Sequence, residues 1–436
     1  MTDNALPERS RKAVWHPCTQ MKQHETLPLI ALARAEGVWL YGHDGKRYLD
    51  AVGSWWVNLF GHGNSRINAA IRSQLDTMEH VMLAGFTHEP VVELSERLSK
   101  LVPGKLGHCF YSSDGASAVE IALKMSFHYW RNSGHPEKSV FVSVQNGYHG
   151  ETLGALSVTD VALFADAYAP LLRQSAHVST PDWRYASEGE FPRDHALRAA
   201  ATLEAYLAEH HAQTAAFIVE PLVQGAAGMG MYHPDYLKRA REICDKYQVH
   251  LIADEIAVGF GRTGTLFACE QAGIAADIMC LGKGLSGGYL PLSVVMTTEK
   301  VYEAFYDDNV ARGFLHSHTH AGNALACRAA LAVLDIFEQE HIIDANRVKA
   351  SYLNHAARPI ASHPKVKNFR NCGMIWAFDV ETSDPAFVGK FSQAALKQEL
   401  SLRPLGNTVY FMPPYIIDQP QMDLLVSGTL RVLESC

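Results

Sequence analysis

The 436-residue sequence has no long apolar run, no cluster of basic residues and no closely spaced cysteine pair. A membrane-spanning helix needs about 20 consecutive apolar residues, and the opening MTDNALPERSRKAVWHP lacks the apolar core of a signal peptide. We therefore expect no membrane association. A net charge of −8 without a run of Lys or Arg argues against a nucleic-acid partner. The eight cysteines form no C-x-x-C motif, so neither a zinc knuckle nor a disulfide framework is indicated, and a reducing cytoplasm fits best.

Internal repeats, low-complexity tracts and obvious flexible linkers are also missing. The 47% hydrophobic content suffices for a large core, and the length suggests two or three structural units. From about residue 66, apolar patterns typical of helices alternate with short apolar runs typical of strands. This alternation predicts a mostly parallel sheet covered by helices on both faces.

The patterns also give approximate positions for the elements. Segment 37–52 predicts a β-hairpin with Asp44 and Gly45 in its turn, and segment 161–195 looks like a surface excursion. Strands are expected at 108–113, 139–144, 215–221, 251–256 and 278–282, and helices at 67–81, 117–130, 236–247, 265–273 and 324–339. Segments 366–380 and 408–417 suggest a small α+β domain in the C-terminal part.

Two residues at the ends of successive strands carry the strongest chemical signal. Asp254 ends the run LIAD, and Lys283 lies between two glycines after the run IMCL. An enzyme that uses pyridoxal phosphate needs a buried anion beside the cofactor's ring nitrogen and a lysine that holds its aldehyde as a Schiff base. The alternative is that Asp254 is a capping or ion-pair residue and Lys283 a solvated surface lysine.

A rival motif overlaps this region. Segment 259–264, GFGRTG, matches the pattern G-x-G-x-x-G after a strand, which is typical of dinucleotide binding, and Asp277 follows it. However, the strand carries Asp254 and Glu255 where a pyrophosphate would approach, and Asp277 precedes the next strand instead of following it. A nicotinamide cofactor is therefore the weaker interpretation.

Further residues would suit a phosphate and a planar ring. Gly115 and Ala116 open the helix expected at 117–130, where free N–H groups, the helix dipole and small side chains favour an anion. The alternative is ordinary N-capping by Ser113 or Asp114. Tyr148 lies in the turn NGYHG after a strand, where its ring could cover a planar cofactor.

Three histidines raise the possibility of a metal site. His316, His318 and His320 alternate in HSHTHAGN and could line one strand face as ligands. No acidic or cysteine ligand is adjacent, so histidines of a loop or pocket are the favoured interpretation, and no metal is expected.

Together these pieces resemble the class III, or omega, aminotransferases of fold type I, over essentially the whole chain. The motifs that carry the resemblance occur in the order DGKRYLD, SSDGASAVEIALK, NGYHG, VEPLVQGAAGM, ADEIAVGFGRTG, LGKGLSGG and HTHAGNALA. The resemblance implies an α/β fold: a large domain with a mostly parallel seven-stranded sheet, and a small α+β domain. Its implied division is an N-terminal segment 1–60 that contributes to the small domain, a large cofactor-binding domain 61–328 and a C-terminal small domain 329–436.

The same resemblance implies pyridoxal phosphate as cofactor and assigns roles to individual residues. Lys283 would hold the aldehyde, and Asp254 would pair with the pyridinium nitrogen. The phosphate would be bound by Gly115 and Ala116, and the ring would stack on Tyr148. Thr319 would reach the phosphate of the neighbouring subunit's cofactor, which implies a homodimer with both sites at the interface.

Within the family the chain is similar to members that convert 8-amino-7-oxononanoate to 7,8-diaminononanoate in biotin biosynthesis, with S-adenosylmethionine as amino donor. The segments that carry this similarity are WHPCTQM, AVGSWWVNLFGHGN, ALKMSFHYW and RPLGNTVYFMPPY. Trp55 and Trp56 offer an apolar wall for an aliphatic chain, and Arg403 offers a clamp for its carboxylate. The alternative is that the adjacent tryptophans only pack a domain interface.

Two positions expected to face the substrate depart from that pattern. Cys18 replaces a tyrosine after His-Pro, and His318 replaces a proline before the threonine. The segments GKGLSGGYLPL, HSHTHAGN and KVYEAFYDD also resemble relatives that take the amino group from lysine. Lysine therefore remains an alternative donor. The sequence also leaves open an omega-aminotransferase for ornithine, 4-aminobutyrate or a polyamine, an aminomutase of the same fold, and a non-catalytic cofactor-binding protein.

Overall fold

The computed structural model describes residues 5–27 and 29–435, so the outer ends of the expected domains, at residues 1 and 436, lie outside it. The described chain divides into two compact units. The small unit comprises the described parts of Met1–Ser65, Val348–Phe369 and Trp376–Cys436, and the large unit comprises Arg66–Arg347 and Arg370–Ile375. The domain boundaries expected from the sequence stay a prediction.

The large unit is built on a sheet that has seven strands in the described part of the chain. Its order is β4-β12-β11-β10-β7-β5-β6. The strands are β4 Leu106–Ser112, β5 Val140–Val144, β6 Ala176–Val178, β7 Thr214–Val219, β10 His250–Asp254, β11 Ile278–Leu281 and β12 Ser293–Thr298. All neighbours from β11 to β6 are parallel, whereas β12 is antiparallel to both β11 and β4. The expected mostly parallel, seven-stranded sheet is confirmed.

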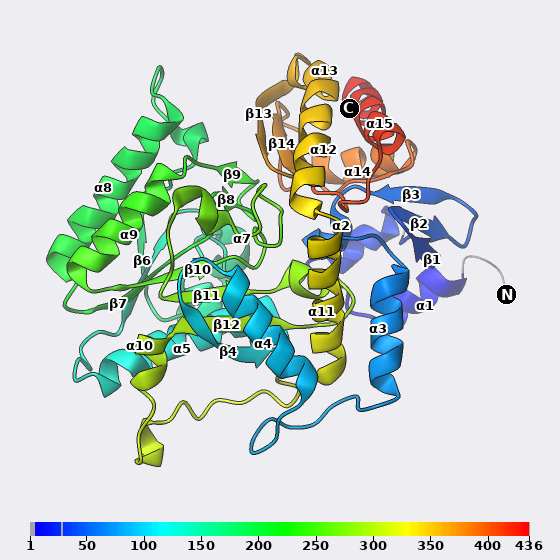
Figure 1. Ribbon diagram of the computed structural model, residues 1–436. Helices are drawn as coiled ribbons and strands as arrows, with labels where there is room; N and C mark the ends of the chain where they lie inside the picture. The colour runs from blue at the N-terminus through cyan, green and yellow to red at the C-terminus, as the bar shows by residue number, and fades with distance from the viewer. Residues whose placement is uncertain (1–4, 28, 436) are drawn as a thin grey trace. The chain divides into compact units, whose positions relative to one another are not determined.

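Long helices cover this sheet. Helix α5 (Gly115–Asn132) packs on β11, β12 and β7 through an apolar face that includes Val119, Ala122 and Leu123. Figure 1 shows α8 (Pro192–His210) and α9 (Asp235–Tyr247) side by side. Helices α4 (Glu89–Leu101) and α11 (Ala324–Gln339) also pack together. Because α11 is apolar at helical spacing over its whole length, the sequence predicted its bounds correctly.

Two expectations for the large unit were wrong in part. The helix expected at 67–81 is α3 (Ser65–Leu75), which ends before the polar stretch that follows. The surface excursion expected at 161–195 contains β6, which extends the sheet beyond β5, and the first turn of α8. A strand of three residues at a sheet edge is too short to show the alternation that identifies strands.

The small unit joins the N- and C-terminal parts of the chain. Its first sheet contains β1 Leu32–Glu36, β2 Trp39–Gly42, β3 Arg47–Asp50 and β15 Leu400–Ser401. β2 and β3 form the expected hairpin, and β15 pairs with β3 in parallel. A second sheet contains β13 Val366–Cys372, β14 Ile375–Val380 and β16 Thr408–Phe411, with α14 Phe387–Leu396 and α15 Gln419–Ser435 nearby in sequence. Among the described residues, no helix is both long enough and apolar enough to cross a bilayer.

Candidate active site

Four parallel strands of the large unit end at one edge of the sheet, and polar residues follow each of them. Asp254 is the last residue of β10 and pairs with Cys280 of β11, three residues before Lys283. His149 follows β5, and Glu220 follows β7 directly. The carboxyl ends of parallel strands are where open α/β sheets bind ligands, so the fold places these residues in the expected position.

The Asp254 carboxylate is buried and oriented by neighbours. Asp254 is only 5% exposed to solvent. His149 Nδ1 donates to Oδ2 at 2.8 Å, and the Ile256 N–H donates to Oδ1 at 3.2 Å. The other ring nitrogen of His149 is buried and has no hydrogen-bond partner among the described residues. Because a carboxylate has further lone pairs, Asp254 can accept a third hydrogen bond from a cationic ring nitrogen.

Lys283 begins the short 3-10 helix η5 (Lys283–Ser286) directly after β11. Its φ of 36° is in the left-handed region, which a residue other than glycine rarely occupies. Although part of the side chain remains accessible, desolvation lowers the pKa of Lys283, while the carboxylates of Asp254 and Glu220 raise it. A lowered pKa favours the neutral amine, which is the nucleophilic form.

The N-terminus of α5 has the features of an anion site. The Asp114 side chain caps the helix by accepting the Ser117 N–H at 2.9 Å. The capping alternative is therefore correct for Asp114, yet the N–H groups of Gly115 and Ala116 remain available at the first turn. A Cβ on Gly115 would lie 2.9 Å from Ile256 Cγ2. Only glycine therefore lets the helix approach the segment that follows Asp254.

Tyr148 lies in the turn that follows β5 and packs on the start of α5. A Cβ on Gly150 would lie 2.6 Å from the Ala116 Cβ, so the turn packs directly on the start of α5. The Tyr148 N–H donates to Glu220 Oε2, and its hydroxyl donates to Glu151 Oε1, both at 2.9 Å. The ring is half-buried, and its hydroxyl bond to Glu151 restricts its orientation.

Glu220 was not predicted as a site residue, because the sequence pattern places it within a strand. Its carboxylate accepts the N–H groups of Tyr148 and Gly225, each at 2.9 Å. Burial raises the pKa of Glu220 to about 7, against the lowering effect of His149. An acidic residue at the carboxyl end of a buried strand was the available signal, and it is the same signal that identified Asp254.

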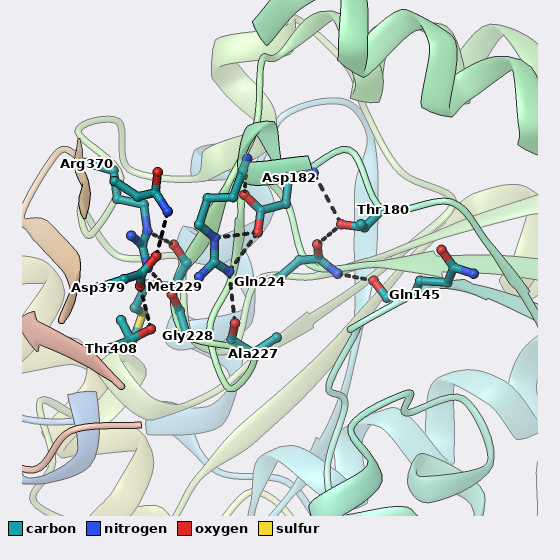
Figure 2. A network of polar contacts seen from close by, with 12 residues as sticks. Gln145, Thr180, Asp182, Gln224, Ala227, Gly228, Met229, Arg370, Asp379 and Thr408 are labelled. Atoms are coloured by element: carbon teal, nitrogen blue, oxygen red, sulfur yellow. Dashed lines mark hydrogen bonds and ion pairs between the residues drawn. The ribbon is translucent and has the colours of Figure 1, made fainter. Parts of the chain in front are cut away.

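Hydrogen bonds made by both the side chains and the backbone of the loop after Glu220 hold it in place, as Figure 2 shows. Gln224 donates to the Gln145 carbonyl at 2.8 Å and accepts from the Thr180 hydroxyl. Arg370 donates to the carbonyls of Gly228 and Met229. These contacts hold the loop in the conformation in which the Gly225 N–H donates to Glu220. The motif VEPLVQGAAGM supplies the residues of this loop.

The remaining expected residues of the large unit belong to the segment that precedes α11. Thr319 is exposed. The His318 ring lies 5.0 Å from that of His316, whereas His320 pairs with His80 at 4.8 Å. The described residues contain no group of three or more His, Cys, Asp or Glu side chains that could hold a metal.

The glycine-rich segment 259–264 forms turns instead of a dinucleotide cradle. The helix that follows, η4 (Ala268–Ala272), has its first N–H groups bound by Glu255. Ala268 and Cys269 donate to that carboxylate at 2.9 and 2.8 Å. A pyrophosphate would need those same donors, so the rival interpretation is wrong.

The small unit gathers four of the expected substrate residues. The Arg403 guanidinium lies over the Trp55 ring at 5.2 Å and donates to the Cys18 carbonyl at 2.7 Å. Trp55 is 44% exposed, whereas Trp56 is buried and donates its indole N–H to the Tyr410 hydroxyl. The packing interpretation therefore fits Trp56 alone, and Trp55 with Arg403 forms an accessible stacked pair.

The tryptophans belong to a left-handed turn, α2 (Gly53–Trp56). The φ angles of Ser54, Trp55 and Trp56 are 47°, 70° and 76°. A left-handed conformation costs roughly 1–2 kcal/mol per non-glycine residue. Such strain persists only where the surroundings enforce it, and it is common at functional sites.

Comparison with known proteins gives the family. Residues 20–433 match the family Aminotransferase class-III. The chain is 43% identical to adenosylmethionine-8-amino-7-oxononanoate aminotransferase of Helicobacter pylori, over 97% of this chain and 96% of the relative. It is 39% identical to the protein of that name from Geobacter sulfurreducens, with 97% and 96% covered.

Solved structures agree with the fold described above. The crystal structure of adenosylmethionine-8-amino-7-oxononanoate aminotransferase from Methanocaldococcus jannaschii superposes with a TM-score of 0.94 at 33% identity, covering 100% of both chains. The omega transaminase from Pseudomonas jessenii in complex with PMP gives 0.94 at 30% identity, covering 99% of this chain and 98% of that one. By sequence and by structure, this chain belongs to the class-III aminotransferases.

Proposed function

We propose that the protein transfers an amino group to 8-amino-7-oxononanoate, forming 7,8-diaminononanoate for biotin biosynthesis, with S-adenosylmethionine as donor. Its cofactor is pyridoxal phosphate. The observation that carries the proposal is the placement of the buried Asp254 and of Lys283 at the ends of adjacent strands, beside the open N-terminus of α5. The names of the relatives from Helicobacter pylori and Geobacter sulfurreducens support the substrate and donor.

The chemistry of the described residues suits this cofactor. The N–H groups of Gly115 and Ala116 would hold its phosphate, Tyr148 would cover its ring, and Asp254 would accept its ring N–H. When bound, the cofactor withdraws electrons from the carbon that carries the transferred amino group. His149 keeps Asp254 oriented through the 2.8 Å hydrogen bond.

Lys283 acts first as a nucleophile and then as the group that moves a proton. Its lowered pKa favours the neutral amine, whose Nζ would take a proton from the substrate carbon and return it to the adjacent position. The nearby carboxylates of Asp254 and Glu220 favour the protonated amine in between.

Six residues would supply the substrate contacts. Arg403 would bind the carboxylate of the keto acid, because a guanidinium matches a carboxylate with two parallel hydrogen bonds. Trp55 and Trp56 would border its aliphatic chain. Cys18 and His318 would border the donor, as would Tyr148 from its place over the ring.

We further propose a cytoplasmic homodimer with both sites at the subunit interface. Thr319 would reach the partner's phosphate. Its segment carries three strongly exposed apolar residues, Tyr306, Val310 and Leu315, at 79%, 72% and 79%. A second copy of the chain would cover these side chains.

A donor experiment tests the reaction. Purified enzyme is mixed with one amine at a time, and the loss of the bound cofactor's yellow absorbance is followed in a single turnover. We expect rapid loss with S-adenosylmethionine and formation of 7,8-diaminononanoate once 8-amino-7-oxononanoate is added. Rapid reaction with lysine alone would overturn the donor, and good turnover of 4-aminobutyrate or ornithine with 2-oxoglutarate would overturn the substrate.

Lys283→Ala is the matched control for this experiment. It should remain folded, retain some cofactor through the phosphate and ring contacts, and show no turnover with any amine. Near-normal turnover in this variant would reject the assignment of Lys283.

A further inference from the structure

The left-handed turn of the small unit is held by a buried carboxylate. Asp50 ends β3 and is 1% exposed. Its Oδ1 accepts the Ser54 N–H at 2.9 Å, and its Oδ2 accepts the Ser54 hydroxyl at 2.7 Å. His62 Nε2 donates to the same Oδ2 at 3.0 Å. Three hydrogen bonds thus join the strained turn to the strand before it and to the segment after it.

The left-handed conformation of the turn determines which tryptophan is buried and which is exposed. Trp56 is 5% exposed and is anchored by its indole N–H on Tyr410 of β16. Its neighbour Trp55 is consequently presented at the surface, where the Arg403 guanidinium covers its ring at 5.2 Å. A right-handed turn would send the two rings in other directions relative to the backbone.

Stacking leaves the edge of the guanidinium available. Arginine has five N–H donors in one plane, and in the described chain the Arg403 side chain donates a hydrogen bond only to the Cys18 carbonyl. A ring stacked on one face restricts rotation of that plane but does not occupy its other donors. The free edge is therefore pre-oriented for a carboxylate.

We propose that Asp50 and His62 are positioning residues for carboxylate recognition: they hold the left-handed turn that places Trp55 under Arg403. This inference rests on the proposed function, in which Arg403 binds the keto acid. Asp50 and His62 make no contact with substrate in this role, and they act through Trp55.

The central variant is Asp50→Asn, which keeps the shape but replaces one carboxylate oxygen with an NH2 group, and this group cannot accept hydrogen bonds from Ser54 or His62. We expect the KM for 8-amino-7-oxononanoate to rise about tenfold, as expected for loss of roughly one charge-assisted hydrogen bond. The single-turnover rate with the donor should stay within about twofold of the wild type. A cofactor-free readout is nonanoate binding to the apoprotein, followed by tryptophan fluorescence, with an equal loss of affinity.

Rescue separates this role from a general loss of stability. Ser54→Gly relieves the left-handed strain, so Asp50→Asn combined with Ser54→Gly should regain most of the affinity for nonanoate. The matched control combines Asp50→Asn with Gln248→Gly, which relieves a residue of φ 52° in the large unit. This control should raise the thermal midpoint without restoring affinity.

The other outcomes separate a failure of the positioning role from a failure of the proposed function. If Arg403→Ala weakens keto-acid and nonanoate binding but Asp50→Asn does not, the positioning role is rejected and the proposed function stands. If Arg403→Ala has no effect on either, the carboxylate clamp of the proposed function is rejected. Equal rescue by Gln248→Gly would show that Asp50 only stabilises the fold. If Asp50→Asn does not fold, His62→Gln and His62→Ala are compared instead, and only the alanine variant should weaken nonanoate binding.

Discussion

At the scale of single residues, the central contact of the candidate site is the hydrogen bond between His149 and Asp254. The imidazole donates to the carboxylate, and the protein excludes water from both groups. A buried anion in a water-excluded site interacts strongly with a cation that binds beside it. Its charge, more than its shape, is therefore what the site requires of Asp254.

Asp254→Asn isolates that charge. The amide oxygen can still accept from His149, but a neutral side chain cannot keep a ring nitrogen protonated. We expect turnover to fall by about 10²- to 10³-fold, the usual effect of removing one electrostatic contact of this kind, whereas pyridoxal phosphate should bind less than tenfold more weakly. Steady-state kinetics and cofactor titration of the apoprotein measure the two effects. Full activity would show that another group supplies the charge.

The sequence predicted Asp254 and Lys283 as site residues because each lies at the end of a buried apolar run and each has a distinctive chemistry. It could not identify the pairing of Asp254 with His149. That contact joins β5 and β10, which are separated in the sheet by β7, and strand order is not readable from a local pattern. Glu220 was missed because the strand expected at 215–221 contains it, whereas β7 ends at Val219.

At the scale of elements, the apolar pattern was most reliable for long or fully buried segments. Helix α11 and strands β7 and β11 were placed within about two residues, since burial on all sides leaves an unmistakable apolar run. The pattern was uninformative for β12, whose antiparallel direction follows from tertiary pairing alone. It was misleading for β6, an edge strand of three residues.

One lysine donates hydrogen bonds to carbonyls at the C-terminal ends of both α8 and α9. Lys138 is buried, and its Nζ donates to the carbonyls of His211, Thr214 and Gln248 at 2.7, 3.1 and 3.0 Å. Lys138→Met would leave three carbonyls without this donor. We expect a loss of about 3 kcal/mol in the free energy of unfolding, measured as a fall of several degrees in the thermal midpoint.

An exposed lysine of α9 provides the control for that variant. Lys246 forms a surface ion pair with Glu204, and such pairs contribute about 0–1 kcal/mol. Lys246→Met should therefore change the midpoint only slightly. Equal effects of the two substitutions would contradict the structural role of Lys138.

A buried histidine of β10, His250, makes the free energy of unfolding depend on pH. His250 on β10 contacts Ser126 Oγ at 2.9 Å and packs on the Trp130 ring, and burial lowers its pKa to about 4. The unfolded chain binds a proton near pH 6.5, but the folded chain does not until about pH 4. Stability from this residue is therefore present above pH 6.5 and is lost as the pH falls from 6.5 towards 4.

His250→Gln removes that dependence. Between pH 6.5 and pH 5 the wild type should lose about 2 kcal/mol through this residue, and the variant should lose correspondingly less. Thermal unfolding across this range measures the difference. The exposed His355→Gln serves as the control and should follow the wild type; parallel curves for all three proteins would refute the assignment.

At the scale of the whole molecule, the role proposed for the exposed Thr319 requires a second copy of the chain. Leu315→Asp places a charge on the apolar segment beside it. We expect this variant to be monomeric in sedimentation velocity, with turnover reduced at least tenfold. Leu163→Asp, at a residue 84% exposed elsewhere in the chain, should leave both properties unchanged. A wild type that sediments as an active monomer would refute the dimer and the role of Thr319 together.

The antiparallel strand β12 has a consequence for synthesis on the ribosome. It pairs with β4 at one side and β11 at the other, so β4, which ends at Ser112, has no neighbour in the sheet until Ser293–Thr298 has been made. At about 5–20 residues per second, this leaves an apolar strand without its partner for roughly 10 to 40 seconds. During that interval the nascent chain exposes a strand edge that other chains could join, and shielding by a chaperone at this stage would favour a high yield of folded protein.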